Sequence, residues 1–318
     1  MRVLNKLKRG LKGPSHKEDN SPRDVSAAPP VQLSTELGTT GPRILHEGKN
    51  AIVDIVFLHG LTGGRDRTWS ATDAGDPWPL LLLSEDLPNA RLITYGYDAD
   101  VVHWTRAAGQ ATIREHSKNL VQDLGNIRRT PPETVGRPII FVVHSLGGLV
   151  CEDAIFFCNN AISRSHEDFL ASVHGVVFFG TPHAGSDFTK FATAISDIIS
   201  LSIVKKPNRA LLDVLSKNSE MLANIENDLF TLIRNRSKSG KKPIDLFVFI
   251  EELPLAATGR RVVESSSAMI KGYDSGTIHA DHMGITKFAT RDNQYGRVLG
   301  LLREWVGQIE ATQGTVKN

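Results

Sequence analysis

The fold is decided by the stretch Pro138-Ile-Ile-Phe-Val-Val-His-Ser-Leu-Gly-Gly-Leu-Val150, an apolar run that ends in a polar pair and two glycines. The run predicts a buried parallel strand, and the apolar spacing after the glycines predicts a helix. A sharp turn with Ser145 at its apex joins the two. This strand, turn and helix are typical of a nucleophile elbow, in which a serine hydroxyl projects above the edge of a sheet.

The small residues of this turn have a physical purpose. A Cβ at Gly147 would obstruct the close approach of the strand and helix backbones. The N–H of Leu146, at the start of the predicted helix, is free to stabilise a developing oxyanion. Val143 stands two residues before Ser145, where the usual pattern has glycine, so the motif is weaker than a full GxSxG. Taken alone, the motif also fits a purely structural turn.

Length and composition predict one large α/β domain. The chain has 318 residues, of which 40% are hydrophobic and 23% charged, enough for a sizeable core. Cys151 and Cys158 lie in an apolar helical context, which indicates core thiols in a reducing compartment. No stretch approaches 18 uninterrupted apolar residues, and there is no signal peptide with a long apolar centre. We therefore expect no membrane span and an intracellular, cytoplasmic location.

The charge is unevenly distributed. The net charge is +2, and six cations lie within residues 1–17 without any acid, which leaves 31 basic and 35 acidic residues elsewhere. The body of the protein is thus no basic surface for nucleic acid. Residues 1–12 combine a leucine stripe with cations, which predicts peripheral membrane contact or a mitochondrial presequence, with a disordered basic tail as the alternative. We expect residues 1–42 to be a flexible tail and linker, 43–310 the folded domain, and 311–318 a flexible end.

A glycine-rich loop follows the first long predicted strand, 51–58. It begins at His59 and continues through Gly60 and Leu61. The chain has no GxxxxGK[ST] and no GxGxxG motif, so we expect no nucleotide and no other cofactor. In hydrolases of this topology such a loop supplies the second oxyanion donor, and we assign this role to the N–H of Leu61.

Two polar residues at predicted strand ends do not fit the order of a Ser, acid, His triad. Asp98 precedes Ser145, and His183 follows it too closely, so we interpret Asp98 as structural and His183 as loop structure or pocket wall. Residues 187–236 carry two apolar helical stripes. They predict a cap-like insertion over the site, with ordinary core-covering helices as the alternative. Such a cap would favour a substrate with an acyl or another apolar group.

The expected acid follows a later strand, 244–250. Glu251 is the first choice because it comes directly after the strand. Glu252 is an alternative, as is Glu264, which follows a short predicted strand at 261–263. For each of these carboxylates, the alternative is a solvent-exposed loop residue without a catalytic role.

The expected base lies in a late loop that is able to return over the nucleophile. His282 is preferred because Met283, Gly284 and a predicted helix follow it, and His279 is the alternative. His279, Asp281 and His282 lack the helical i, i+4 pair or the further ligands of a metal site, so no metal is expected.

These parts occur in the order of a serine hydrolase. We predict an α/β fold with a mostly parallel central sheet flanked by helices, and a Ser145–His282–Glu251 triad that cleaves an acyl ester of a hydrophobic or lipid substrate. The alternative is a catalytically idle fold that serves as a binding or signalling module.

Several motifs between residues 52 and 288 carry a family resemblance: IVFLHGLTGG, ITYGYDAD, FVVHSLGGLV, VVFFGTPHAGSD and ADHMGITKF. They resemble the serine active site-containing protein family and the lipase-like domains at the N-terminus of fungal NOD-like receptors. The resemblance implies an α/β-hydrolase fold and an esterase or lipase of lipid metabolism or, in receptors, an effector domain. It carries the nucleophile to Ser145, the base to His282 and, less directly, the acid to Glu251. No nucleotide-binding or repeat region follows in this sequence, which argues against a receptor role for the chain as given.

Overall fold

The computed structural model describes residues 39–316 apart from 62, 73–74, 100–108, 130–133, 184–187 and 203–218. The chain divides into two units, residues 1–36 and 37–318, and the fold described below belongs to the second. Of the predicted tail 1–42, the part up to residue 38, with its basic segment 1–12, lies outside the described residues.

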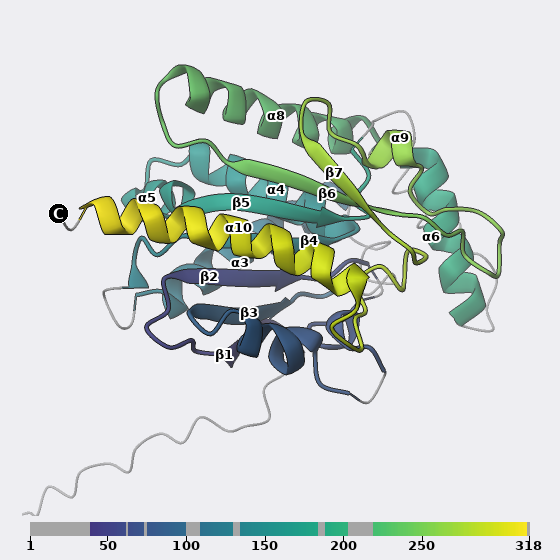
Figure 1. Ribbon diagram of the computed structural model, residues 1–318. Coiled ribbons are helices and arrows are strands. Elements are labelled where there is room, and N and C mark those ends of the chain that lie inside the picture. Colours follow the sequence, from purple (N-terminus) through teal and green to yellow (C-terminus); the bar gives the residue numbers. More distant parts are fainter. Residues whose placement is uncertain are drawn as a thin grey trace, which may run out of the picture. The chain divides into compact units, whose positions relative to one another are not determined.

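The second unit is built on one seven-stranded sheet (Figure 1). The strands are β1 (Gly41–His46), β2 (Val53–Leu58), β3 (Ala90–Gly96), β4 (Ile139–His144), β5 (Val173–Phe179), β6 (Asp245–Glu251) and β7 (Asp274–Ile278). Their order is β1-β3-β2-β4-β5-β6-β7, with β1 antiparallel to β3 and every other pair parallel. With helices on both faces and the serine turn after the central strand β4, this is the α/β-hydrolase fold, and the predicted fold class is confirmed.

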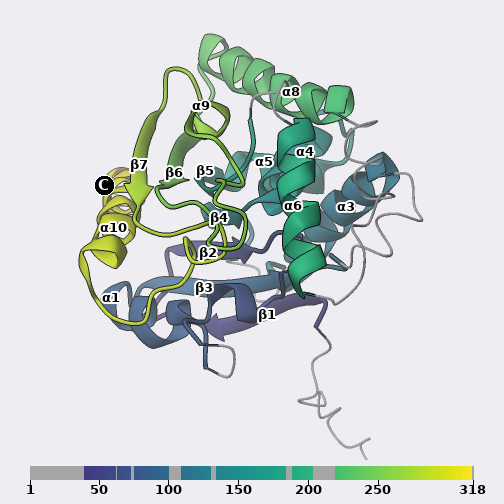
Figure 2. The ribbon, with the colours of Figure 1, turned by 90° about the vertical axis from the view of Figure 1, so that its right-hand side faces the viewer.

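Helices cover both faces of the sheet (Figure 2). The helical segments are η1 (Arg67–Trp69), η2 (Pro79–Leu83), α1 (Ser84–Asp86), α3 (Gly109–Ile127), α4 (Leu146–Asn159), α5 (Arg164–Ser172), α6 (Phe188–Ser202), α8 (Ser219–Lys238), α9 (Ser265–Ala268) and α10 (Asn293–Val316). Helices α3, α4 and α8 lie on one face, and α10 lies on the other. No described helix has the length and apolarity to cross a membrane.

Alternate residues of each strand supply two separate cores, because successive side chains point to opposite faces of a sheet. Phe141 and Val143 of β4 belong to the core under α3, α4 and α8. Ile140 and Val142 belong to the core that contains Trp78 and α10. All residues of β2 to β5 are buried, as expected for strands covered on both faces.

The structure places the predicted insertion between β5 and β6 as α6 and α8. Its middle, 203–218, lies outside the described residues. Two local predictions differ from the structure. Residues 261–263 form a loop and not a strand, and β1 and β7 are absent from the predicted strands. The domain limits at 43 and 310 stay a prediction; residue 43 lies in β1 and residue 310 in α10.

Candidate active site

The elbow is a one-residue link between β4 and α4. Strand β4 ends at His144, α4 begins at Leu146, and Ser145 between them has φ +53° and ψ −128°. A positive φ in a residue with a side chain is strained, and such strain persists where the surroundings fix it. Here the N–H of Ser145 donates to the carbonyl of Phe179 at 2.9 Å. With this conformation, Ser145 alone makes the turn from β4 into α4.

Close packing around the elbow accounts for its glycines. A Cβ on Gly147 would lie 2.3 Å from the carbonyl oxygen of His59, closer than any real contact. A Cβ on Gly60 would lie 2.7 Å from the Cβ of Ser145. The glycine-rich loop after β2 therefore lies directly against the turn that carries the serine, as the sequence motif predicts.

Ser145, His282 and Glu251 form one hydrogen-bonded chain. The Oγ of Ser145 lies 3.0 Å from Nε2 of His282, and Nδ1 of His282 lies 2.7 Å from Oε2 of Glu251. Each of the three residues is 1% exposed. Because a carboxylate only accepts hydrogen bonds, Nδ1 carries the ring proton, and Nε2 is left to accept from the serine hydroxyl.

Glu251 is held from its other side by backbone groups. It is the last residue of β6, and its Oε1 accepts from the N–H groups of Val262 and Val263 at 2.7 and 3.0 Å. The chain between β6 and β7 thus returns over the carboxylate. These bonds satisfy a carboxylate that is removed from water.

The alternative residues Glu252 and His279 pair with each other. Nδ1 of His279 lies 2.7 Å from Oε2 of Glu252, and 63% of the His279 side chain is exposed. Hydrogen bonds from Thr277 and His279 lower the pKa of Glu252. Glu264 is exposed at the start of α9. None of these three residues joins the hydrogen-bonded chain of Ser145.

The two predicted oxyanion donors are buried beside the elbow. Leu61 is 5% exposed, and Leu146 is completely buried. Leu146 is the first residue of α4, so its N–H has no acceptor within the helix. In geometric terms, one N–H comes from the loop after β2 and the other from the helix N-terminus.

His59 and Tyr97 pack and bond to each other and so hold the loop that carries Leu61; we call this pair the His59–Tyr97 lock. The two rings stack with centroids 4.5 Å apart at 6°. The Tyr97 hydroxyl donates to the His59 carbonyl at 2.8 Å, and the Tyr97 N–H donates to Nε2 of His59 at 3.3 Å. Burial lowers the pKa of His59 to about 4, so the ring stays neutral and its Nε2 accepts. Sequence analysis missed this lock, although both residues end neighbouring strands of the predicted sheet.

Asp98 and His183 lie apart from the hydrogen-bonded chain. Asp98 is exposed beyond the end of β3. His183 is completely buried, with Nδ1 3.2 Å from Oε1 of Glu152 and its ring against Phe178. This position agrees with the interpretation of His183 as loop structure.

A cavity of about 390 Å³ lies beside α6, and Ser145, His282 and Glu251 are not among its lining residues. It is bounded by α6 and the segment 258–267, with Phe191, Val262 and Val263 among its lining residues. The ring of Phe191 lies 6.4 Å from that of His282. Five charged side chains also line the cavity: Lys190, Asp197, Arg260, Arg261 and Glu264.

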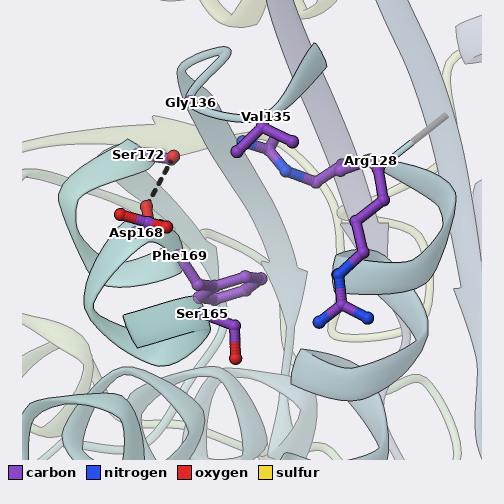
Figure 3. A pocket seen from close by; sticks show the side chains of 9 residues that line it. Arg128, Val135, Gly136, Ser165, Asp168, Phe169 and Ser172 are labelled. Atoms are coloured by element: carbon purple, nitrogen blue, oxygen red, sulfur yellow. Dashed lines mark hydrogen bonds between the residues drawn. The ribbon is translucent and has the colours of Figure 1, made fainter. Parts of the chain in front are cut away.

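A smaller pocket of about 100 Å³ lies between the C-terminal end of α3 and α5 (Figure 3). Arg128, Val135, Asp168 and Phe169 are among its lining residues. Arg128 bonds Asp54 at the start of β2, whereas Ser145 follows the end of β4, so this pocket is remote from the elbow. Among the described residues, no group of three or more His, Cys, Asp or Glu side chains is arranged to hold a metal ion.

Comparison with known proteins shows similarity to one curated protein in several animals. No family model matches the chain. Human Protein SERAC1 is 24% identical over 273 residues, which cover 79% of this chain and 38% of that protein. The zebrafish (Danio rerio) protein of the same name is 23% identical, over 80% of this chain and 39% of its own length. The chain thus spans under two fifths of these relatives.

Solved structures that are similar to this one include two bacterial proteins. Bacillus licheniformis lipase BlEst2 in its mature form has a TM-score of 0.49 and 18% identity, over 82% of this chain and 99% of its own. MenH from S. aureus has a TM-score of 0.44 and 12% identity, over 85% and 99%. The resemblance to fungal receptor domains stays a prediction.

Proposed function

We propose that this protein is a serine carboxylic-ester hydrolase that works through an acyl-enzyme. The observation that carries the proposal is the continuous line from the Ser145 hydroxyl through His282 to Glu251, at 3.0 and 2.7 Å, on a strained elbow. A nucleophile within hydrogen-bond reach of a base that a third group orients is the geometry of nucleophilic catalysis. Its members stand in the sequence order of α/β hydrolases.

In the proposed reaction, the Oγ of Ser145 attacks the ester carbonyl carbon while Nε2 of His282 takes its proton. The N–H groups of Leu61 and Leu146 stabilise the oxyanion of the tetrahedral intermediate. His282 then gives the proton to the departing alcohol, and an acyl-serine remains. A water molecule, deprotonated by His282, attacks the acyl-serine. His282 then returns this proton to the Oγ of Ser145 as the ester bond to the enzyme breaks and the acid is released. Glu251 accepts the hydrogen bond of Nδ1 and stabilises the imidazolium in both halves of the reaction.

The proposed substrate is an ester with a hydrophobic or lipid acyl group. Three apolar residues that line the cavity support this part: Phe191, whose ring lies 6.4 Å from that of His282, Val262 and Val263. Its charged lining residues favour a substrate that also carries polar atoms.

The test is labelling by a fluorophosphonate probe together with turnover of esters with short, medium and long acyl chains. We expect the wild type to label and to hydrolyse at least one ester, and Ser145→Ala to do neither while it keeps its melting temperature. Labelling that persists in Ser145→Ala would refute the nucleophile. A folded wild type that neither labels nor turns over any ester would favour the idle binding module.

A further inference from the structure

We infer that His144 is a positioning residue for His282. The ring of His144 holds the backbone of His282, while the adjacent Ser145 contacts the ring of His282. The inference rests on the proposed function and adds a residue to it. His144 is the last residue of β4, directly before the elbow.

The hydrogen bond defines the state of the His144 ring. Its Nε2 lies 2.9 Å from the backbone carbonyl oxygen of His282. A carbonyl oxygen only accepts, so Nε2 of His144 must carry the proton and donate it. His144 is 5% exposed, and the two imidazole rings lie 4.8 Å apart at 40°. The ring is therefore packed and bonded to one partner residue.

Two adjacent residues thus hold His282 at two points. His144 fixes the backbone of His282, and Ser145 fixes the far nitrogen of its ring. Both come from the end of the central strand, whereas His282 comes from a loop 137 positions later in the chain. The bond of His144 therefore ties the base to the rigid sheet and not to its own loop. A misplacement of about 1 Å in such a site can cost on the order of 10² in rate.

The electrostatics of His144 suit this role. Burial lowers the pKa of His144 well below its ordinary value, and the neighbouring His282 acts in the same direction. The ring of His144 accordingly stays neutral while His282 gains a proton during the reaction. A second positive charge at this distance would disfavour the imidazolium on which proton transfer depends.

Two variants separate the hydrogen bond from the packing. His144→Gln retains an amide N–H near the position of Nε2, whereas His144→Phe retains a ring without a donor. We expect His144→Phe to lower kcat about 10- to 100-fold with KM within about 3-fold of wild type. We expect His144→Gln to recover most of that loss. A matched control is His174→Phe, because His174 is equally buried at the start of β5 and remote from the elbow, and kcat should not change.

Equal losses in the Gln and Phe variants, or an unchanged kcat in His144→Phe, would overturn the inference. A measurement without turnover separates it from the proposed reaction: the NMR signal of the His282 Nδ1 proton that bonds Glu251. We expect this signal to broaden or shift in His144→Phe and to persist in His144→Gln and His174→Phe. An inactive wild type with this pattern would refute the proposed reaction alone, and an unchanged signal in His144→Phe would refute the positioning role alone.

Discussion

The two ends of the sheet each bury a carboxylate, and their partners differ. At the carboxyl end, Glu251 meets an imidazole and two backbone N–H groups. At the amino end, Asp54 is completely buried and meets the guanidinium groups of Arg91, Arg128 and Arg137. Histidine side chains as a class are suited to proton transfer, whereas a guanidinium in a protein stays charged.

This difference separates the proposed chemical site from a structural cluster. Arg91 lies in β3, Arg128 follows α3 and Arg137 precedes β4, so Asp54 ties three segments to the start of β2. No member of that cluster is suited to take a proton from a substrate. Glu251 ties segments together as well, but its partner His282 leads on to a hydroxyl. A buried carboxylate therefore gains a chemical role from its partner and not from its burial.

The largest expected effect comes from removing His282, the middle residue of the hydrogen-bonded series Ser145–His282–Glu251. We predict that His282→Ala lowers kcat for the ester found in the labelling screen by about 10⁶-fold, because neither Ser145 nor the leaving group then has a proton partner. Steady-state kinetics and the melting temperature would be measured on the same preparation. A folded His282→Ala protein with more than a hundredth of the wild-type kcat would contradict the proposed base.

The next effect comes from neutralising the acid. We predict that Glu251→Gln lowers kcat by about 10⁴-fold, because an amide N–H directed at Nδ1 favours the wrong tautomer of His282. Glu252→Gln and Glu264→Gln should stay within about 3-fold of wild type, since neither residue joins the chain of Ser145. If Glu252→Gln were the more damaging of the two neighbouring changes, the exposed Glu252–His279 pair would replace Glu251–His282 as the functional one.

The sequence allowed the candidate residues to be singled out because each one ends a strand or lies in a loop at the carboxyl end of a parallel sheet. Ser145, Glu251 and His282 are all of this kind, and their order in the chain is the basis of the roles proposed for them. The choice between Glu251 and Glu252 could not be made with the same force, because it depends on where β6 ends. Strand β7 was missed because its sequence, Asp274–Ile278, is mostly polar and exposed.

The amino-end cluster was beyond sequence analysis for another reason. Asp54 is a single acid in an apolar strand, and its partners stand 37, 74 and 83 positions further along the chain. Nothing local in the sequence connects them. The contact of His59 with Tyr97 and the bond of His144 to His282 also join residues far apart in the sequence, so they were not predicted either. Long-range partners of buried polar groups are decided by the tertiary fold.

Asp54→Asn is the change that matches Glu251→Gln at the other end of the sheet. It leaves three arginines around a neutral amide, and loss of one partner from a buried ion pair costs about 3–5 kcal/mol. We predict that urea denaturation shows a loss of this size in the free energy of unfolding, with kcat of the folded protein within about 3-fold of wild type. Glu251→Gln should show the reverse pattern, a large loss of kcat and a small loss of stability. Similar losses of both quantities in both variants would remove the distinction between the two ends.

The smallest expected effect concerns the loss of folding stability at acid pH. We expect it at the carboxyl end of the sheet, where buried histidines are neutral. Burial lowers the pKa of His59 from 6.5 to about 4 in the folded protein. A depressed pKa means that the unfolded chain takes up the proton first, so the stability that His59 contributes is present above pH 6.5 and is lost as the pH falls toward 4.

In His59→Gln, a side-chain oxygen can still accept from the N–H of Tyr97 but cannot titrate. Between pH 6.5 and pH 5, we predict that the wild type loses about 1.5 kcal/mol more unfolding free energy than His59→Gln. Urea denaturation at both pH values measures this difference, in which the contributions of all other histidines cancel. Equal losses in the two proteins would show that the His59–Tyr97 lock does not keep the ring neutral.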